Sequence, residues 1–338
     1  MTETLDKITY TPAPVAARRS PTPVLEVSAL TKDFDIRTRQ GPRTLRAVGG
    51  VSFQIPSGST FALVGESGCG KSTIGRAILR LVEPTSGSVR LAGVDVTRAK
   101  ASQLKALRCD MQMVFQDPYS SLDPRYRVID CIREPMRIQG LHRRGVDPTE
   151  RALTLMKRVG LGVEHAFRYP HQFSGGQRQR IGLARALALN PKLIVCDEPV
   201  SALDVSIQAQ VINLMRELQR DLGLAYLFIS HDMSVVRLIS DHVGVMYLGK
   251  LVEQGPTEDV FDQPAHPYTK ALLSAVPRAG GTKAARVPLC GEVPSPMNPP
   301  SGCVFHPRCP SAIPICSQVV PEATVKSCGR LVACHCVD

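Results

Sequence analysis

Residues 65–73 read Gly-Glu-Ser-Gly-Cys-Gly-Lys-Ser-Thr and follow the apolar run Thr-Phe-Ala-Leu-Val at residues 60–64. The spacing matches G-x-x-x-x-G-K-[ST], a glycine-rich turn between a strand and a helix whose backbone N–H groups surround a phosphate. Residues 72–81 favour the helix that this arrangement needs. The four fixed positions arise by chance in roughly one chain in a hundred of this length, so the stretch indicates a phosphate-binding loop rather than a simple turn.

Two side chains of this loop carry its chemistry. Lys71 is placed to reach the β- and γ-phosphates of a nucleotide, and the Ser72 hydroxyl is placed to ligate Mg²⁺. We therefore expect the nucleotide to contact the whole loop, which comprises Gly65, Glu66, Ser67, Gly68, Cys69, Gly70, Lys71, Ser72 and Thr73.

The composition is that of a folded protein with a basic balance. The chain has 338 residues, enough for one large and one smaller domain, and no run approaches the ~18 consecutive apolar residues of a membrane span. The net charge of +11 fits a nucleic acid, an anionic membrane surface, anionic ligands or simply scattered surface arginines. Because no basic run is interleaved with aromatic residues, we expect no nucleic-acid partner.

The two ends of the chain differ from its middle. Residues 1–23 contain four prolines and lack an apolar core segment, which predicts a disordered arm rather than a secretory signal. Seven of the eleven cysteines lie at or after Cys290. Without an export signal, a disulfide framework is not expected for them.

Apolar strands alternate with helical stretches between residues 24 and 276, which is typical of an α/β fold. Residues 205–222 place Ile207, Val211, Leu214, Met215, Leu218 and Leu222 on one helix face, and residues 117–180 read as an inserted, arginine-rich helical subdomain. We predict a domain over residues 24–276 and a proline-rich extension over residues 277–338. The expected strands are residues 25–27, 60–64, 111–115, 193–196, 225–229 and 243–248.

A pair of acids ends the apolar run at residues 193–196. A carboxylate at a strand end beside a phosphate loop can hold Mg²⁺ directly or through water, and we assign this role to Asp197. The adjacent Glu198 is then the base that activates water for attack on the γ-phosphate. An isolated Asp-Glu pair is more often a turn, but the upstream phosphate loop favours the functional interpretation.

A second candidate anion site lies at residues 173–180, which read Phe-Ser-Gly-Gly-Gln-Arg-Gln-Arg before an Ala/Leu-rich helix at 181–189. Ser174 is a suitable N-cap, and Gly175 and Gly176 leave the helix start open to an anion. Because the phosphate loop already has its own helix, this second one indicates another nucleotide, or the same nucleotide approached from another subunit. An ordinary capped helix is the simpler alternative.

Together these motifs resemble those of ABC-transporter ATPases. Residues 65–73 are similar to Walker A, Gln116 to the Q-loop, residues 174–177 to the signature, residues 196–199 to Walker B, residues 201–204 to the D-loop and His231 to the H-loop. The resemblance implies a P-loop NTPase fold of ABC type, with a RecA-like core, a β-subdomain and a helical subdomain. Phe173 stands where the family more often has leucine, and Phe34 stands where an adenine-stacking aromatic usually lies, although Phe34 reads equally well as a core residue.

The resemblance also implies a head-to-tail dimer that closes on ATP. The signature of one subunit would cover the nucleotide bound by the other, His231 would contact the γ-phosphate, and Gln116 would link Mg²⁺ and the attacking water to a transmembrane partner. Since ATP contacts both subunits only in the closed state, its binding favours closure, and hydrolysis permits reopening. The residues concerned are Ser174, Gly175, Gly176 and Gln177 in the signature and Ser201, Ala202, Leu203 and Asp204 in the D-loop.

The surroundings of the motifs resemble one branch of this family, the ATP-binding subunits of dipeptide and oligopeptide importers, which nickel and other small-solute importers share. The stretches that carry this likeness are residues 114–124, 169–176 and 265–273, the last reading Ala-His-Pro-Tyr-Thr-Lys-Ala-Leu-Leu. The likeness implies two transmembrane permease subunits, a paralogous ATP-binding subunit in a heterodimer, an extracytoplasmic solute-binding protein and a peripheral position on the cytoplasmic face of the inner membrane.

The extension contains Gly-Cys-Val-Phe-His-Pro-Arg-Cys-Pro at residues 302–310. A proline-rich segment of this size buries little apolar surface, so a metal cross-link would stabilise it. Some members of this branch carry a [4Fe–4S] cluster there, and the resemblance implies Cys303, Cys309, Cys316 and Cys334 as ligands, with Cys336 as an alternative to Cys334 and with Cys290 and Cys328 unused. The alternative is an extension with reduced cysteines that docks on the ATPase core.

Two other functions remain as alternatives to a peptide-importer ATPase. A soluble ABC protein acting on nucleic acid has only the positive charge in its favour, because the chain shows one set of motifs and no heptad repeat. A kinase that uses the same loop would leave the signature helix and His231 without a role.

Overall fold

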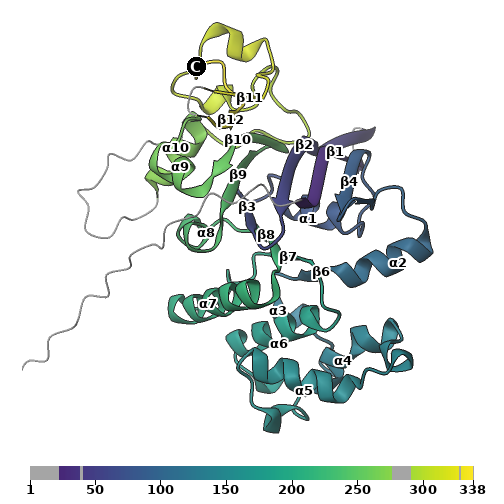
Figure 1. Cartoon of the computed structure of the whole chain (residues 1–338). Coiled ribbons are helices and arrows are strands. Elements are labelled where there is room, and N and C mark those ends of the chain that lie inside the picture. The colour runs from purple at the N-terminus through teal and green to yellow at the C-terminus, as the bar shows by residue number, and fades with distance from the viewer. Residues whose placement is uncertain (1–22, 39–40, 276–290, 327–328, 338) are drawn as a thin grey trace, which may run out of the picture.

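A sheet of eight strands forms the centre of the molecule, in the order β11-β12-β10-β9-β3-β8-β7-β6 (Figure 1). The computed structural model describes residues 23–38, 41–275, 291–326 and 329–337. The five strands from β9 to β6 run parallel, and the rest of the sheet is antiparallel. The bounds are β3 Thr60–Val64, β6 Met111–Val114, β7 Leu193–Asp197, β8 Ala225–Ile229, β9 His242–Tyr247, β10 Lys250–Pro256, β11 Thr324–Val325 and β12 Leu331–Val332.

The parallel strands are the ones that their sequence predicts best. β3, β7 and β8 are buried along their whole length, because both faces of a parallel sheet are covered and the strands are therefore almost wholly apolar. The predicted strands at 60–64 and 225–229 are confirmed at both ends. Those at 111–115 and 193–196 differ from the structure by one residue at one end, and the one at 243–248 differs by one residue at each end.

Helices cover this sheet. α7 spans the predicted residues, and its buried face contains Val211, Leu214, Met215 and Leu218, whereas Leu222 is 40% exposed beside the terminal Gly223. The bounds are α1 Lys71–Ile78, α2 Ala101–Asp110, α7 Val205–Leu222, α8 Met233–Ile239, α9 Thr257–Asp262 and α10 Pro267–Ser274.

A second, antiparallel sheet has the order β2-β1-β4-β5. The sequence predicted only residues 25–27 of it. β2 alternates exposed and buried residues at one end only, so most of this hairpin lacks the continuous apolar signal of the central strands. The bounds are β1 Pro23–Thr38, β2 Gly41–Pro56, β4 Ser86–Leu91 and β5 Val94–Asp95.

A helical subdomain lies beyond β6 and α7, at the end of the molecule opposite the C-terminal residues (Figure 1). Its helices pack through buried residues such as Ile132, Met156 and Ile181. The bounds are α3 Pro118–Ser121, α4 Val128–Ile138, α5 Pro148–Arg158 and α6 Gly175–Leu187, with short turns at Leu141–Arg144, Val163–His165 and Pro170–Gln172.

The described part of the extension, residues 291–326 and 329–337, adds β11 and β12 to the outer side of β10. Two short 3₁₀ helices, His306–Arg308 and Pro314–Ser317, precede these strands in the chain. Residues 1–22 of the predicted arm, the predicted boundary at residues 276–277, and Cys290 and Cys328 lie outside the described residues. Within the described residues, no helix combines the length and apolar character that a membrane crossing requires.

Candidate nucleotide-binding site

The phosphate loop connects β3 to α1, and glycine is required at two of its positions. A side chain on Gly65 (φ +152°) would lie 2.2 Å from the carbonyl oxygen of Met246, and one on Gly70 (φ +105°) would lie 2.2 Å from that of Ala47. Neither backbone oxygen can move aside, and both φ values fall where other residues are strained. One side of the loop therefore packs closely on the backbone at Met246 and Ala47, and a ligand would bind on the opposite side.

Lys71 begins α1 and is 4% exposed. Its Nζ donates to the carbonyl oxygens of Gly65 (2.8 Å) and Glu66 (2.9 Å), so the ammonium lies within the curve of the loop. Both acceptors are neutral, and the positive charge remains available to an anion. This position fits the predicted contact with nucleotide phosphates.

Ser72 and Asp197 meet across the boundary between α1 and the end of β7. The Ser72 hydroxyl donates to Asp197 Oδ1 at 2.7 Å, and Asp197 is only 2% exposed. Burial raises the pKa of Asp197, although the Ser72 hydrogen bond opposes this shift. A buried carboxylate beside a hydroxyl is a donor set that suits Mg²⁺, which prefers oxygen ligands. The residues present therefore fit the predicted ion.

Glu198 follows Asp197 with a strained backbone, since its φ is +46°. This conformation places the carboxylate between two predicted site residues. Gln116 Nε2 donates to Glu198 Oε2 at 2.9 Å, and His231 Nδ1 lies 3.2 Å from Oε1. The structure thus brings the three predicted catalytic side chains together from three separate loops.

The signature begins α6 as the sequence predicts. Gln177 N–H donates to Ser174 Oγ (3.3 Å), and Ser174 N–H donates to Gln177 Oε1 (3.0 Å), which forms a reciprocal cap. The helix starts at Gly175, six residues before the predicted Ala/Leu-rich stretch at 181–189. A side chain on Gly176 would lie 2.4 Å from Ile207 Cγ2, so α7 packs directly on this helix start.

The D-loop joins β7 to α7 beside the signature. Ser201 Oγ donates to the carbonyl oxygen of Glu198 at 3.1 Å, and Leu203 Cδ2 would lie 3.1 Å from a side chain on Gly175. Ala202 and Asp204 are exposed, and Asp204 precedes α7. The loop therefore connects the carboxylate to the signature of the same chain. Figure 1 places α6 itself well apart from α1 and the phosphate loop.

Phe34 lies on β1 opposite Leu45 of β2, half-buried, with Lys32 Nζ 4.7 Å from its ring centre. It does not belong to the buried core clusters among the described residues. The alternative that Phe34 is a core residue is thus not favoured, and its stacking role stays a prediction.

Sequence reasoning missed two residues that contact the phosphate loop from the C-terminal part of the chain. Arg308 donates from Nη1 and Nη2 to the two carboxylate oxygens of Glu66, at 2.8 and 3.1 Å. The Glu66 N–H donates to the hydroxyl of Tyr268 at 3.0 Å. Both residues stand in stretches already notable in the sequence, residues 302–310 and 265–273, but nothing local indicates that they meet at residue 66.

The extension is attached to the core at further points. Phe305 is 1% exposed and packs with Tyr247 and Tyr268, with ring centres 5.2 and 5.4 Å away. Arg330 is 3% exposed and lies 3.6 Å from Glu253, which is completely buried. Its guanidinium also donates to two backbone carbonyl oxygens, those of Asp259 and Gln263.

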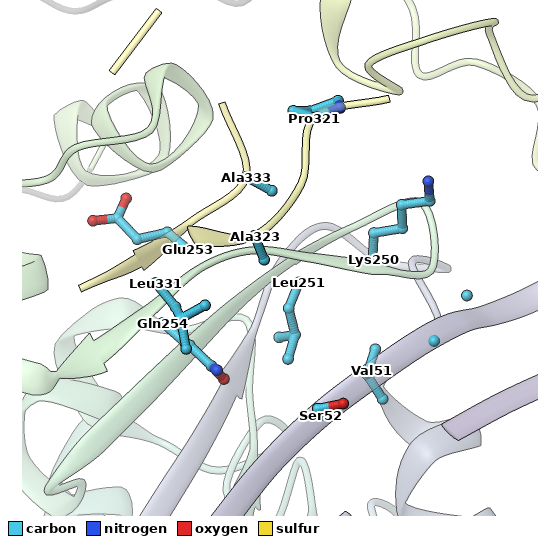
Figure 2. A pocket seen from close by; sticks show the side chains of 12 residues that line it. Val51, Ser52, Lys250, Leu251, Glu253, Gln254, Pro321, Ala323, Leu331 and Ala333 are labelled. Carbon is cyan, nitrogen blue, oxygen red and sulfur yellow. The ribbon is translucent and has the colours of Figure 1, made fainter. Parts of the chain in front are cut away.

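A cavity of about 350 Å³ lies at the seam between the core and the extension (Figure 2). Its wall mixes apolar with polar residues and has no cluster of charged groups of one sign. The lining comes from β2 (Gly49, Gly50, Val51 and Ser52), from β10 and its turn (Lys250, Leu251, Glu253 and Gln254) and from the extension (Pro321, Ala323, Leu331 and Ala333).

The cysteines in the described part of the extension lie close enough to affect one another's pKa, but they are not arranged to hold a metal ion. Cys303 N–H donates to the carbonyl oxygen of Cys316 at 2.8 Å, and Cys336 N–H to the sulfur of Cys334 at 3.4 Å. Burial raises the pKa of Cys303 and of Cys309, and the neighbouring cysteines raise both further. Across residues 23–38, 41–275, 291–326 and 329–337, no group of three or more His, Cys, Asp or Glu side chains is arranged to hold a metal ion. The predicted [4Fe–4S] ligand set of Cys303, Cys309, Cys316 and Cys334 is not supported, whereas the alternative of a docked extension agrees with the contacts above.

Comparison with known proteins agrees with this geometry. Residues 48–201 match the family model "ABC transporter", and residues 252–316 match "Oligopeptide/dipeptide transporter, C-terminal region". The chain is 53% identical to the oligopeptide transport ATP-binding protein AppF of Bacillus subtilis, over 92% of this chain and 97% of that protein. It is 52% identical to the oligopeptide transport ATP-binding protein OppF of Salmonella typhimurium, over 93% and 96% respectively.

Solved structures show the same fold. The chain matches cbiO1 of Clostridium perfringens, part of the ABC transporter complex cbiONQ, with a TM-score of 0.62 and 26% identity, over 71% of this chain and 91% of that one. It matches the dimeric ATP-binding cassette MJ0796, solved with ADP and Pi, with a TM-score of 0.61 and 26% identity, over 69% and 98% respectively.

Proposed function

Since the chain belongs to the ABC transporter family, in the branch with the oligopeptide/dipeptide transporter C-terminal region, we propose that it is the ATP-binding and ATP-hydrolysing subunit of a peptide importer. The observation that carries the hydrolytic role is the position of the Glu198 carboxylate. It lies between Gln116 and His231, one residue after the Ser72–Asp197 pair. The peptide cargo follows from the relatives, which are named for oligopeptide transport.

The residues of the phosphate loop bind and orient the substrate. Lys71 faces the phosphates, and the loop N–H groups surround them, as the requirement for glycine at Gly65 and Gly70 supports. Ser72 and Asp197 would hold Mg²⁺, which neutralises phosphate charge when bound. Gln116 would reach the same ion.

Glu198 accepts the proton of the attacking water. The Gln116 hydrogen bond occupies one of its carboxylate oxygens and His231 lies beside the other, so the carboxylate is fixed in orientation before substrate arrives. His231 is 57% exposed at its side chain and can also contact the γ-phosphate.

The signature acts on the nucleotide of a second subunit. Ser174 and Gln177 are exposed at the start of α6, and Figure 1 shows α6 apart from α1, the helix that follows the phosphate loop of the same chain. We propose a dimer with a paralogous ATP-binding subunit, in which each signature covers the other's ATP. The similarity to a cassette solved as a dimer with ADP and Pi supports this arrangement.

The remaining partners are two transmembrane permease subunits and, through them, an extracytoplasmic solute-binding protein, with the chain peripheral on the cytoplasmic face of the inner membrane. Large apolar side chains exposed around the helical subdomain supply a surface for the permease. These are Phe115, Tyr119, Tyr126, Ile138, Phe167 and Tyr169.

Glu198→Gln tests the hydrolytic assignment. The glutamine keeps an oxygen that accepts from Gln116 but cannot take a proton, so we expect nucleotide binding to persist while turnover falls at least ~100-fold. Steady-state ATPase rates and equilibrium nucleotide binding of the assembled complex measure the two effects. Glu258→Gln, which neutralises an exposed glutamate paired with Arg237, is the matched control and should hydrolyse ATP normally. A normal rate for Glu198→Gln would show that another group is the base.

A further inference from the structure

Two stretches from the C-terminal part of the chain converge on one residue of the phosphate loop. Tyr268, in α10, accepts the hydrogen bond of the Glu66 N–H, and Arg308, in the extension, holds the Glu66 carboxylate with both terminal nitrogens. Arg308 stands 242 positions away from Glu66 in the sequence. The contacts fix both the backbone and the side chain of the loop's second residue.

The environment of this pair makes it strong. Arg308 is 7% exposed and the Glu66 side chain 25% exposed, so water screens their attraction only in part. The two terminal nitrogens of the guanidinium each donate to one oxygen of the Glu66 carboxylate. This bidentate geometry fixes the orientation of the Glu66 side chain as well as its distance from Arg308. Tyr247 contacts both Arg308 and Tyr268. Its hydroxyl lies 3.4 Å from Arg308 Nη1, and its ring packs against the ring of Tyr268.

The charge of Glu66 would otherwise oppose substrate binding. The same residue's carbonyl oxygen accepts from Lys71, so its carboxylate belongs to the loop that receives the triphosphate. An unpaired carboxylate there repels a multiply charged anion and is free to draw Lys71 away from it. The Arg308 pair removes both effects.

We propose that Arg308 is a positioning residue for ATP binding, through which the extension neutralises and orients Glu66 and holds the phosphate loop in its binding conformation. The extension then contributes a residue that supports the nucleotide site, through the contact of Arg308 with Glu66. This inference rests on the proposed ATP-binding function. Arg308 touches Glu66 and Tyr247, and its action on ATP is indirect.

The experiment compares the full chain as wild type, Arg308→Met, Arg308→Lys, Glu66→Gln and the double variant Arg308→Met/Glu66→Gln. Methionine keeps the length and the apolar contact with Tyr247 but removes the charge. Affinity for trinitrophenyl-labelled ATP, displaced by ATP, is measured directly, and KM and kcat for ATP are measured in the assembled transporter. Arg330→Met, which removes the other buried arginine of the extension, is the control for loosened docking, and melting temperatures are recorded for all forms.

We expect Arg308→Met to weaken ATP binding roughly tenfold, the scale of one uncompensated charge near an anionic ligand, and to raise KM more than it lowers kcat. Adding Glu66→Gln should restore affinity to within about twofold of wild type, because the charge that Arg308 compensates is then gone. The ATP affinity of Arg308→Lys should lie between those of wild type and Arg308→Met, because lysine keeps the positive charge but lacks the two-pronged guanidinium.

Two results would overturn the inference. One is wild-type affinity for Arg308→Met; the other is weak binding by Arg308→Met that Glu66→Gln fails to restore, which would reduce Arg308 to a docking residue. If the wild-type chain bound no ATP, the proposed function itself would fail, and the two failures are thereby distinguishable.

Discussion

Asp197, the proposed Mg²⁺ ligand, opposes the stability of the folded chain. Its carboxylate is almost fully buried and has the Ser72 hydroxyl as a partner, and burial raises its pKa. When the pKa of an acid is higher in the folded than in the unfolded state, its contribution to stability is present at low pH and is lost as pH rises through the folded pKa. At neutral pH, without a cation, this residue therefore destabilises the fold.

Asp197→Asn should raise the melting temperature of the metal-free protein at neutral pH by roughly 2 °C, the shift that ~1 kcal/mol gives in a domain of this size. Asparagine still accepts from Ser72 but has no charge to bury. The advantage should disappear below about pH 4, where the ordinary aspartate is protonated. Thermal denaturation in EDTA across pH measures this, and the added stabilisation by Mg²⁺ and ATP should be lost in the variant. A lower melting temperature in EDTA would contradict this account.

At the scale of elements, the contact between α6 and α7 couples the signature to the D-loop. Gly176 is the residue that lets the two helices approach, because Ile207 occupies the place of a side chain there. The start of α6, where Ser174 is the N-cap, therefore depends on the position of α7. The position of α7 depends in turn on the start of α6.

Gly176→Ala should push the start of α6 away from α7 and reduce ATP hydrolysis by the assembled complex about tenfold or more, since a displacement near 1 Å at a reacting site costs up to ~100-fold. Nucleotide binding by the isolated chain should remain, because its own phosphate loop is untouched. Combining the change with Ile207→Ala removes the clash and should recover most of the rate. If the double variant stayed as slow as Gly176→Ala, the contact would not be the cause.

The elements that the sequence predicts well are those with a strong local signal. β3, β8 and α7 have the predicted bounds, because a continuous apolar run or a helical apolar face defines them without help from distant residues. The residues of the phosphate loop are similarly local, as Gly65 to Gly70 form one loop and Lys71 and Ser72 begin the helix that follows it. The partners of Glu66 could not be predicted, because Arg308 reaches it only once the extension is folded onto the core.

At the scale of the whole molecule, Arg330 and Glu253 anchor the extension with charges that are almost completely buried. Removing one member of such a pair leaves the other charge uncompensated, at a cost of about 3–5 kcal/mol. Glu253 still accepts the N–H groups of Ala265 and His266, whereas Arg330 also donates to the carbonyl oxygens of Asp259 and Gln263, so the loss of Arg330 removes several contacts between the extension and the core.

Arg330→Met should therefore release the extension while the central sheet stays folded. Hydrogen exchange of residues 291–337 should become faster, and limited proteolysis should cut there first. Adding Glu253→Gln removes the remaining charge, but its amide NH2 would face one of the two backbone N–H groups that Glu253 accepts, so we expect hydrogen exchange and proteolysis to slow only in part. Unchanged protection of the extension in Arg330→Met would show that Phe305 and β12 hold it without the ion pair.

The two short strands of the extension also have a consequence for solubility. β10 is seven residues long and pairs with β9 on one side and with β12 on the other. Without β12, its outer row of N–H and C=O groups would be open to any extended chain, which is the usual template for intermolecular sheet growth. With it, the sheet ends at β11, which is only two residues long. The extension, whose Arg308 pairs with Glu66 of the phosphate loop, thus also covers this edge of the sheet at Glu253 and Gln254.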